Sequence, residues 1–209
     1  MTDSSVPLHE PFEERLRQRE AYVFGMWLFL ATEILFFGAL MGVYVYIRVT
    51  HPAGLSAGAR ETDATYGTLN LFLLLTSSLT MAIGERGLEA GLRRVARWGL
   101  IVTFLLGCGF LLVKGLEYQE DIAKSLVPGP DFPVAVVGAE PFWAFYWTAT
   151  AVHAAHMTIG LALLVRLMLI DRAGKLMPHQ LSMIVTTLYW HLIDCVWIVL
   201  WVLLYIPGR

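Results

Sequence analysis

Five long runs of apolar residues dominate the chain, and short polar segments separate them. The runs cover about 22–47, 67–83, 98–116, 142–169 and 181–206. Each is near or above the ~20 residues that an α-helix needs to cross a bilayer. The second run is the shortest, and we expect its helix to extend beyond one end or the other. A membrane barrel would show short strands of alternating polarity, so the pattern predicts an all-α integral membrane protein with a bundle of five transmembrane helices.

The polar segments between the runs predict the domain boundaries and the orientation. Residues 1–20 are expected to form a solvated polar tail, although Pro11 and the charges after it permit a short surface helix, and residues 21–209 a single domain. The tail and the loops after the second and fourth runs hold about ten lysines and arginines, against about five on the other side. Because cytoplasmic loops carry this excess, we expect a cytoplasmic N-terminus and an external C-terminus.

Composition supports a membrane location and excludes several classes of protein. Of the 209 residues, 57% are hydrophobic and only 15% are charged, whereas soluble domains carry about a quarter charged residues. The formal net charge is -2 and no basic patch occurs, so no nucleic-acid partner is expected. The only two cysteines, Cys108 and Cys195, lie within apolar runs and indicate no disulfide framework. The polar start of the chain does not resemble a cleavable signal peptide.

Ionisable side chains inside the runs are the candidate functional residues, because such groups are costly at membrane depth. His191 and Asp194 lie three residues apart in the fifth run and therefore share one helix face. His153 and His156 have the same spacing in the fourth run, and Glu33 lies near the middle of the first.

These residues leave two hypotheses open. Imidazole and carboxylate groups suit iron, zinc or copper, so a free-standing membrane metalloenzyme using His153, His156 and His191 is one of them. A di-iron helical bundle, however, needs repeated Glu-x-x-His motifs with more carboxylates. The other hypothesis is that the side chains hydrogen-bond within the bundle, with Glu33 as a neutral or lipid-associated carboxyl or as part of a proton relay.

Two further pairs have a structural interpretation. Lys114 and Glu117 lie three residues apart at the outer end of the third run, where they can pair or extend toward the surface. Gly38 and Gly42 form a small-xxx-small pair, which favours close helix contact. No internal repeat, phosphate-binding loop or nucleophile elbow occurs. The residues thus predict a helical membrane subunit without a self-contained active site, which indicates that the chain is one component of a larger complex.

Motifs on all five runs, in order, resemble subunit III of the haem-copper respiratory oxidases, the cytochrome c oxidase subunit III family. The resemblance extends from about Phe24 to Tyr205. Its elements are Gly25-Met26-x-x-Phe29 with Glu33-x-Leu35-Phe36-Phe37, Leu69-Asn70 with Leu74-Leu75-Thr76-Ser77-Ser78, Lys114-Gly115-x-Glu117-Tyr118, His153-Ala154-x-His156-Met157-x-x-Gly160, and Tyr189-Trp190-His191-x-x-Asp194-x-x-Trp197.

The resemblance implies an accessory subunit in the bacterial cytoplasmic membrane, with no catalytic residue and no metal ligand of its own. Haem and copper are then expected in the partner subunit I, which this chain would contact directly, with subunit II and other subunits in the same complex. The family's subunit III binds phospholipid and supports proton uptake and stability of the catalytic subunit. Glu33 matches a family position close to lipid, and His153, His156, His191 and Asp194 match buried polar positions.

One departure from the family pattern concerns the number of spans. The mitochondrial form has seven spans, and this chain lacks the first two, as many bacterial forms do. The family's lipid cleft lies between those two spans and the other five, so either another chain supplies the missing wall or the wall is absent. A cytochrome c oxidase is the expected complex. A bo-type quinol oxidase and the branch associated with nitric oxide reductases remain alternatives.

Overall fold

The computed structural model describes residues 10–174, 176 and 180–208, and within these ranges all regular structure is helical. The elements are α1 (Glu10–Thr50), α2 (Pro52–Arg60), α3 (Ala64–Glu89), α4 (Arg93–Ala123), α5 (Ala139–Arg172) and α6 (Gln180–Tyr205). Five of them, all except α2, are long and apolar enough to cross a membrane. The predicted all-α bundle of five spans is therefore confirmed.

Four of the five spanning helices, all except α6, extend beyond the predicted runs at both ends, because hydropathy marks only the apolar part of a helix. The second span, predicted at 67–83, is the helix Ala64–Glu89. Its start is fixed by Asp63, whose carboxylate accepts a hydrogen bond of 2.7 Å from the backbone N–H of Thr65. Its end is a turn at Gly91, where φ is +75° and a glycine is favoured.

Helix α1 begins at Glu10, inside the segment predicted as a polar tail. A solvated leader up to residue 20 was the expectation, with a short surface helix as the weaker alternative. Residues 13–20 contain glutamate, arginine, leucine and glutamine, which are strong helix formers, and no glycine or proline interrupts them. Once a helix exists, adding one more turn costs little, so the transmembrane helix continues through this segment. Residues 1–9 lie outside the described part.

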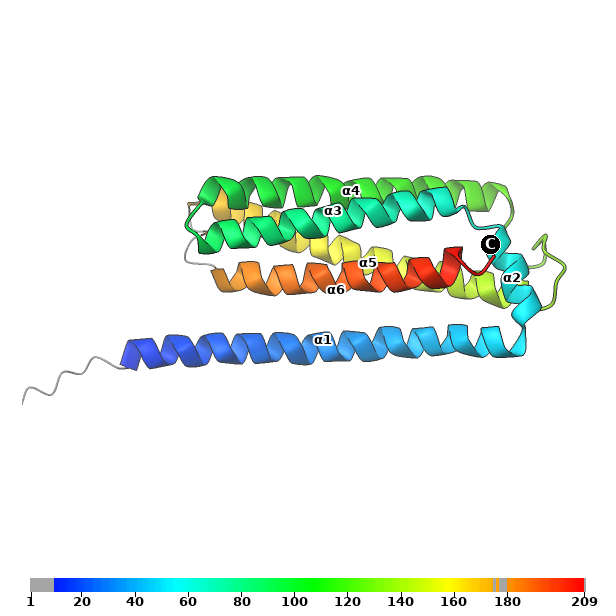
Figure 1. The fold of residues 1–209 in the computed structure, drawn as a ribbon, viewed down its shortest axis with the longest axis horizontal. Coiled ribbons are helices and arrows are strands. Elements are labelled where there is room, and N and C mark those ends of the chain that lie inside the picture. Colours follow the sequence, from blue (N-terminus) through cyan, green and yellow to red (C-terminus); the bar gives the residue numbers. More distant parts are fainter. Residues whose placement is uncertain (1–9, 175, 177–179, 209) are drawn as a thin grey trace, which may run out of the picture.

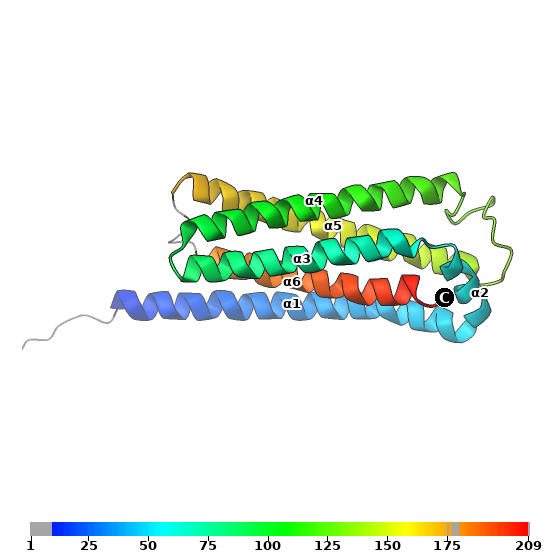
Figure 2. The same ribbon diagram turned by 45° about the horizontal axis from the view of Figure 1, so that its top comes forward.

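Helices α3, α4, α5 and α6 pack side by side along their length, and α1 lies along the α5 and α6 side of this group (Figures 1 and 2). The N-terminal end of α1 and the C-terminal end of the chain lie at opposite ends of the bundle (Figure 1). Among the spans α1 buries the smallest share of its apolar window, 17%, against 50% for α6. Most of the surface of α1 is thus left for lipid or for another chain.

The short helix α2 lies across the end of the bundle where α6 ends, and it was not predicted (Figure 2). Pro52 is at its start, where the missing backbone N–H of proline costs nothing. Gly54 packs directly against the backbone of the loop at Val137, and Gly58 against the ring of Phe142. The end of the chain at Gly208 lies against Ala59, so α2 connects the ends of several spans.

Glycines set the closest helix contact in the bundle, but not at the predicted pair. A Cβ added to Gly99 of α4 would lie 2.6 Å from the Cα of Gly84 in α3, so position 99 needs glycine, and a Cβ at Gly84 would lie a tight 3.3 Å from the Cα of Gly99. Around Gly38 and Gly42 of α1 no described atom lies within 4 Å of such a Cβ. Within the described residues the predicted pair therefore makes no close helix contact, because α1 packs loosely against the rest of the bundle.

Candidate functional site

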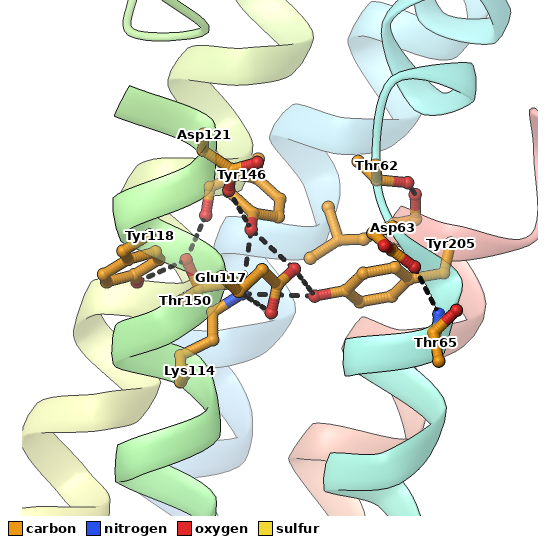
Figure 3. A network of polar contacts seen from close by, with 11 residues as sticks. Thr62, Asp63, Thr65, Lys114, Glu117, Tyr118, Asp121, Tyr146, Thr150 and Tyr205 are labelled. Atoms are coloured by element: carbon orange, nitrogen blue, oxygen red, sulfur yellow. Dashed lines mark hydrogen bonds and ion pairs between the residues drawn. The ribbon is translucent and has the colours of Figure 1, made fainter. Parts of the chain in front are cut away.

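A network of buried polar side chains occupies the end of the bundle nearest α2 (Figure 3). The ammonium group of Lys114 donates to Glu117 Oε2 at 3.0 Å, to the hydroxyl of Tyr146 at 2.9 Å and to that of Tyr205 at 3.1 Å. Tyr146 comes from α5 and Tyr205 from α6, while Lys114 and Glu117 belong to α4. The network therefore ties three spans together.

Because this network is buried, its charged groups lose their hydration and need full hydrogen bonding inside the protein. The side chains of Lys114 and Glu117 are each 2% exposed, so Lys114 pairs inside the protein and does not extend to the surface. An ammonium group has three N–H donors, and each has a partner here. The ring of Tyr146 also lies 4.5 Å from the lysine nitrogen, close enough for a cation–π contact. These contacts offset the cost of removing both charges from water.

Asp121 adds a second carboxyl to the network. The hydroxyl of Tyr146 lies 2.8 Å from Asp121 Oδ2 and also 2.8 Å from Glu117 Oε1. A phenol has one proton and can donate to only one of these oxygens. The other contact is a hydrogen bond only if that carboxyl carries a proton itself. The geometry thus favours one proton on the carboxyl pair, which also leaves one cation and one anion in the network.

Glu33 and His156 meet at the level of the membrane interior, across the contact between α1 and α5. Glu33 Oε2 lies 3.1 Å from Nε2 of His156, and both side chains are nearly buried, at 17% and 18% exposed. Nδ1 of His156 lies 2.8 Å from the carbonyl oxygen of Val152. Because a carbonyl only accepts, Nδ1 must carry a hydrogen. The bond from Nε2 to Glu33 then holds one further proton, either on the carboxyl or on the imidazole.

His191 bonds to α3 and not to Asp194. Its Nδ1 lies 2.7 Å from the hydroxyl of Ser78, and the adjacent indole of Trp190 donates to Ser77 at 3.0 Å. The shared helix face of His191 and Asp194 therefore does not bring the two side chains together. The polar partner of His191 comes from a neighbouring span.

His153 lies in an aromatic environment. It is fully buried, with its ring 5.0 Å from that of Trp197 and 5.4 Å from that of Phe110. Asp194, one turn before Trp197 on α6, is 3% exposed. The three histidines thus contact different neighbours, and the described residues contain no group of three or more His, Cys, Asp or Glu that could hold a metal ion.

An ion-pair cluster at the opposite end of the bundle was missed by sequence reasoning. Asp171 of α5 is 3% exposed and accepts from Nε of Arg93 and from Nε of Arg97, both at 2.6 Å. Arg93 also donates to the backbone carbonyl of Asp171. These arginines were used only to predict orientation, and nothing local links them to an aspartate that lies 78 residues from Arg93 and 74 from Arg97.

Asp121 was missed as well, although the sequence carried a signal for it. It follows Lys114 by seven residues and Glu117 by four, which places all three on one helix face. Tyr146 and Tyr205 had no such signal, because tyrosines are common near the ends of membrane spans.

The fold and these contacts define a multi-pass helical membrane protein whose buried polar groups join its spans to one another. Comparison with known sequences identifies its family. The chain matches the family model for cytochrome c oxidase subunit III over residues 16–209. It therefore belongs to the cytochrome c oxidase subunit III family and is an accessory subunit III of a haem-copper oxidase, a multi-pass protein of bacterial membranes.

Similar proteins come from oxidases of different types. The chain is 32% identical over 193 residues to the probable cytochrome c oxidase subunit 3 of Mycobacterium leprae, with 87% of this chain and 85% of the relative covered. It is 28% identical to the quinol oxidase subunit 3 of Bacillus spizizenii, with 95% and 93% covered. It is 29% identical to the cytochrome bo(3) ubiquinol oxidase subunit 3 of Pseudomonas aeruginosa, with 89% and 85% covered.

Proposed function

We propose that the chain is a non-catalytic subunit that sits beside the haem- and copper-bearing subunit I of a cytochrome c oxidase. The observation that carries this proposal is the family match over residues 16–209 together with the five spans. The chain supports proton uptake by subunit I and the stability of that subunit during turnover. Subunit II and other chains complete the complex. The end of the bundle that holds Arg93 and Arg97, here called the arginine-rich end, faces the cytoplasm.

The polar residues of the spans have a structural role in this proposal. Glu33, His156 and His191 bond to neighbouring helices, and His153 packs between aromatic rings. Each contact fixes the rotation of one span against the next, which apolar packing against lipid does not do. A rigid outer wall against which subunit I can pack is the expected consequence.

Phospholipid is the proposed ligand of the groove between α1 and α6. The groove has a volume of about 510 Å³, and its lining includes Trp27, Ile34 and Phe37 from α1 with Leu192 and Val199 from α6. These are apolar side chains at membrane depth, suited to an acyl chain. The Glu33–His156 bond keeps α1 beside α5 and so maintains one wall of this groove.

Purification of the complex from its source membrane tests the assignment. Mass spectrometry of the co-purifying chains is expected to find a subunit with the haem-binding histidines of a haem-copper oxidase. The separated subunit III should show no Soret absorption and no stoichiometric copper. Tightly bound haem or copper in the separated chain would overturn the non-catalytic role and favour the metalloenzyme hypothesis.

A quinol oxidase is the second candidate for the complex. The relatives from Bacillus spizizenii and Pseudomonas aeruginosa carry quinol oxidase names, and they match most of this chain. Oxygen consumption by the purified complex with reduced cytochrome c, and separately with a quinol, discriminates the two. Oxygen consumption with the quinol but not with reduced cytochrome c would identify the complex as a quinol oxidase.

A further inference from the structure

A second groove lies between α4 and α5 at the arginine-rich end of the bundle. Its volume is about 590 Å³, and it is separate from the groove between α1 and α6. Its mouth is formed by Arg97, near the start of α4, and by Arg172, the last residue of α5. We call it the α4–α5 groove.

The mouth of the α4–α5 groove carries an excess of positive charge. Arg93 and Arg97 both pair with the single carboxylate of Asp171, and Arg172 also lines the groove, so three arginines and one carboxylate leave two positive charges. Asp171 engages Arg97 through Nε. Within the described residues the two terminal nitrogens of Arg97 have no hydrogen-bond partner, and neither has the exposed side chain of Arg172. Guanidinium groups held in this way match the oxygens of a phosphate.

The walls of the groove are apolar and lead away from the mouth. Leu100 and Phe104 line it from α4, and Val165 and Leu169 from α5. Phe104 follows Arg97 by seven residues, so the apolar wall continues about 10 Å along the helix axis toward the bilayer centre. A ligand that fits both parts needs an anionic head and an aliphatic chain. A free anion would leave the walls unoccupied, and an apolar helix would leave the arginines unpaired.

We propose that the α4–α5 groove binds an anionic phospholipid, with its phosphate on Arg97 and Arg172 and one acyl chain between α4 and α5. Because the mouth of the groove carries excess positive charge, an anionic lipid is preferred there over a zwitterionic lipid. This inference requires only that the chain spans a membrane, and it is independent of the identity of the oxidase. It is also independent of Glu33 and of the α1–α6 groove.

Photo-labelling of the intact complex tests the proposal. The complex is placed in phosphatidylcholine vesicles that contain a small amount of phosphatidylglycerol with a diazirine in its acyl chain. Labelled peptides from α4 and α5 are then mapped by mass spectrometry. The matching phosphatidylcholine probe is run in parallel, and co-purification of each variant subunit III with the haem-bearing subunit verifies that the complex is assembled. Labelling of residues 100–104 and 165–169 by the anionic probe is the expected result.

Substitutions on α5 separate the groove from general surface charge. Arg172→Gln should reduce labelling by the anionic probe about fivefold, since one arginine near an anionic lipid contributes about that factor. Arg166→Gln removes an exposed arginine of the same helix that does not line the groove, and labelling should stay at the wild-type level. Leu169→Trp fills the apolar wall and should reduce labelling without changing any charge.

Four results with the lipid probes and the arginine variants would overturn the proposal. They are absence of groove labelling in the wild-type complex, equal labelling by the two lipid probes, wild-type labelling in Arg172→Gln, and an equal loss in Arg166→Gln. The first would mean that another chain covers the groove, and the last that only diffuse surface charge attracts the lipid. Wild-type labelling in Leu169→Trp would likewise exclude an acyl chain between α4 and α5.

Discussion

Replacement of Lys114 by methionine removes the cation from the buried network and leaves its carboxyl groups in place. Glu117 is 1% exposed and Asp121 is 3% exposed, so neither can reach water without opening the bundle. Methionine has a similar length and adds no polar group. The change therefore isolates the charge and the hydrogen bonds of the ammonium group from the volume of the side chain.

The expected loss of stability follows from two limits. Lys114 donates three hydrogen bonds, and an interhelical hydrogen bond in a membrane protein contributes about 0.6 kcal/mol, which gives about 2 kcal/mol in total. Breaking a buried ion pair on one side only costs about 3–5 kcal/mol, because an unpaired charge remains. We expect Lys114→Met to fall in the higher range. Adding Glu117→Gln should return the loss to about 2 kcal/mol, since the unpaired charge is then absent.

Unfolding of the subunit in sodium dodecyl sulfate, followed by tryptophan fluorescence, measures these differences. The rings of Trp143 and Trp197 are fully buried and report on the bundle. Lys124→Met is the matched control, because Lys124 pairs with Glu120 at 2.6 Å at the exposed end of the same helix. Its loss should stay below about 1 kcal/mol. The reasoning is refuted if Lys114→Met costs no more than this control, or if the double variant loses the sum of the two single losses.

Three other predictions concern different parts of the bundle. Glu33→Gln should leave assembly intact, because the amide can still donate to His156, and should shorten sustained turnover or lipid retention; loss of the first turnover would contradict this. Asp171→Asn should lower the free energy of unfolding by about 1–2 kcal/mol in the same assay, since its partners Arg93 and Arg97 are partly exposed. Glu89→Gln, in the exposed pair with Arg86, is the control and should cost less than about 1 kcal/mol. Equal costs would contradict the prediction. Gly99→Ala should cost about 1–3 kcal/mol by separating α3 from α4, whereas Gly109→Ala has room and should have little effect; the prediction fails if both are tolerated.

The number and type of the spans followed from the sequence because both depend on local composition. A run of about twenty apolar residues satisfies its own backbone only as a helix in lipid, whatever lies beside it. The family could also be inferred, since its motifs lie within single spans. Helix ends were less accessible. The cap at Asp63 and the continuation of α1 back to Glu10 depend on polar residues that hydropathy does not weigh.

Polar contacts between spans were decided by the tertiary structure. Lys114 and Glu117 are neighbours on one helix, so their pairing was within reach of the sequence. Their partner Tyr205 lies 91 residues from Lys114, and His156 lies 123 residues from Glu33. The histidines that resembled a metal site contact different helices, because His153 and His156 point to different sides of α5 and His191 of α6 faces α3.

The sequence by itself thus determined five transmembrane helices, their order and the oxidase subunit III family. Only the tertiary structure decided which polar groups meet, that α2 covers one end of the bundle, and that α1 packs loosely. The physical reason is that lipid tails are as apolar as the side chains of the spans, so hydrophobicity does not specify which face of a helix turns inward. That choice depends on close contacts such as Gly84 with Gly99 and on buried hydrogen bonds, which form only when the helices are already side by side.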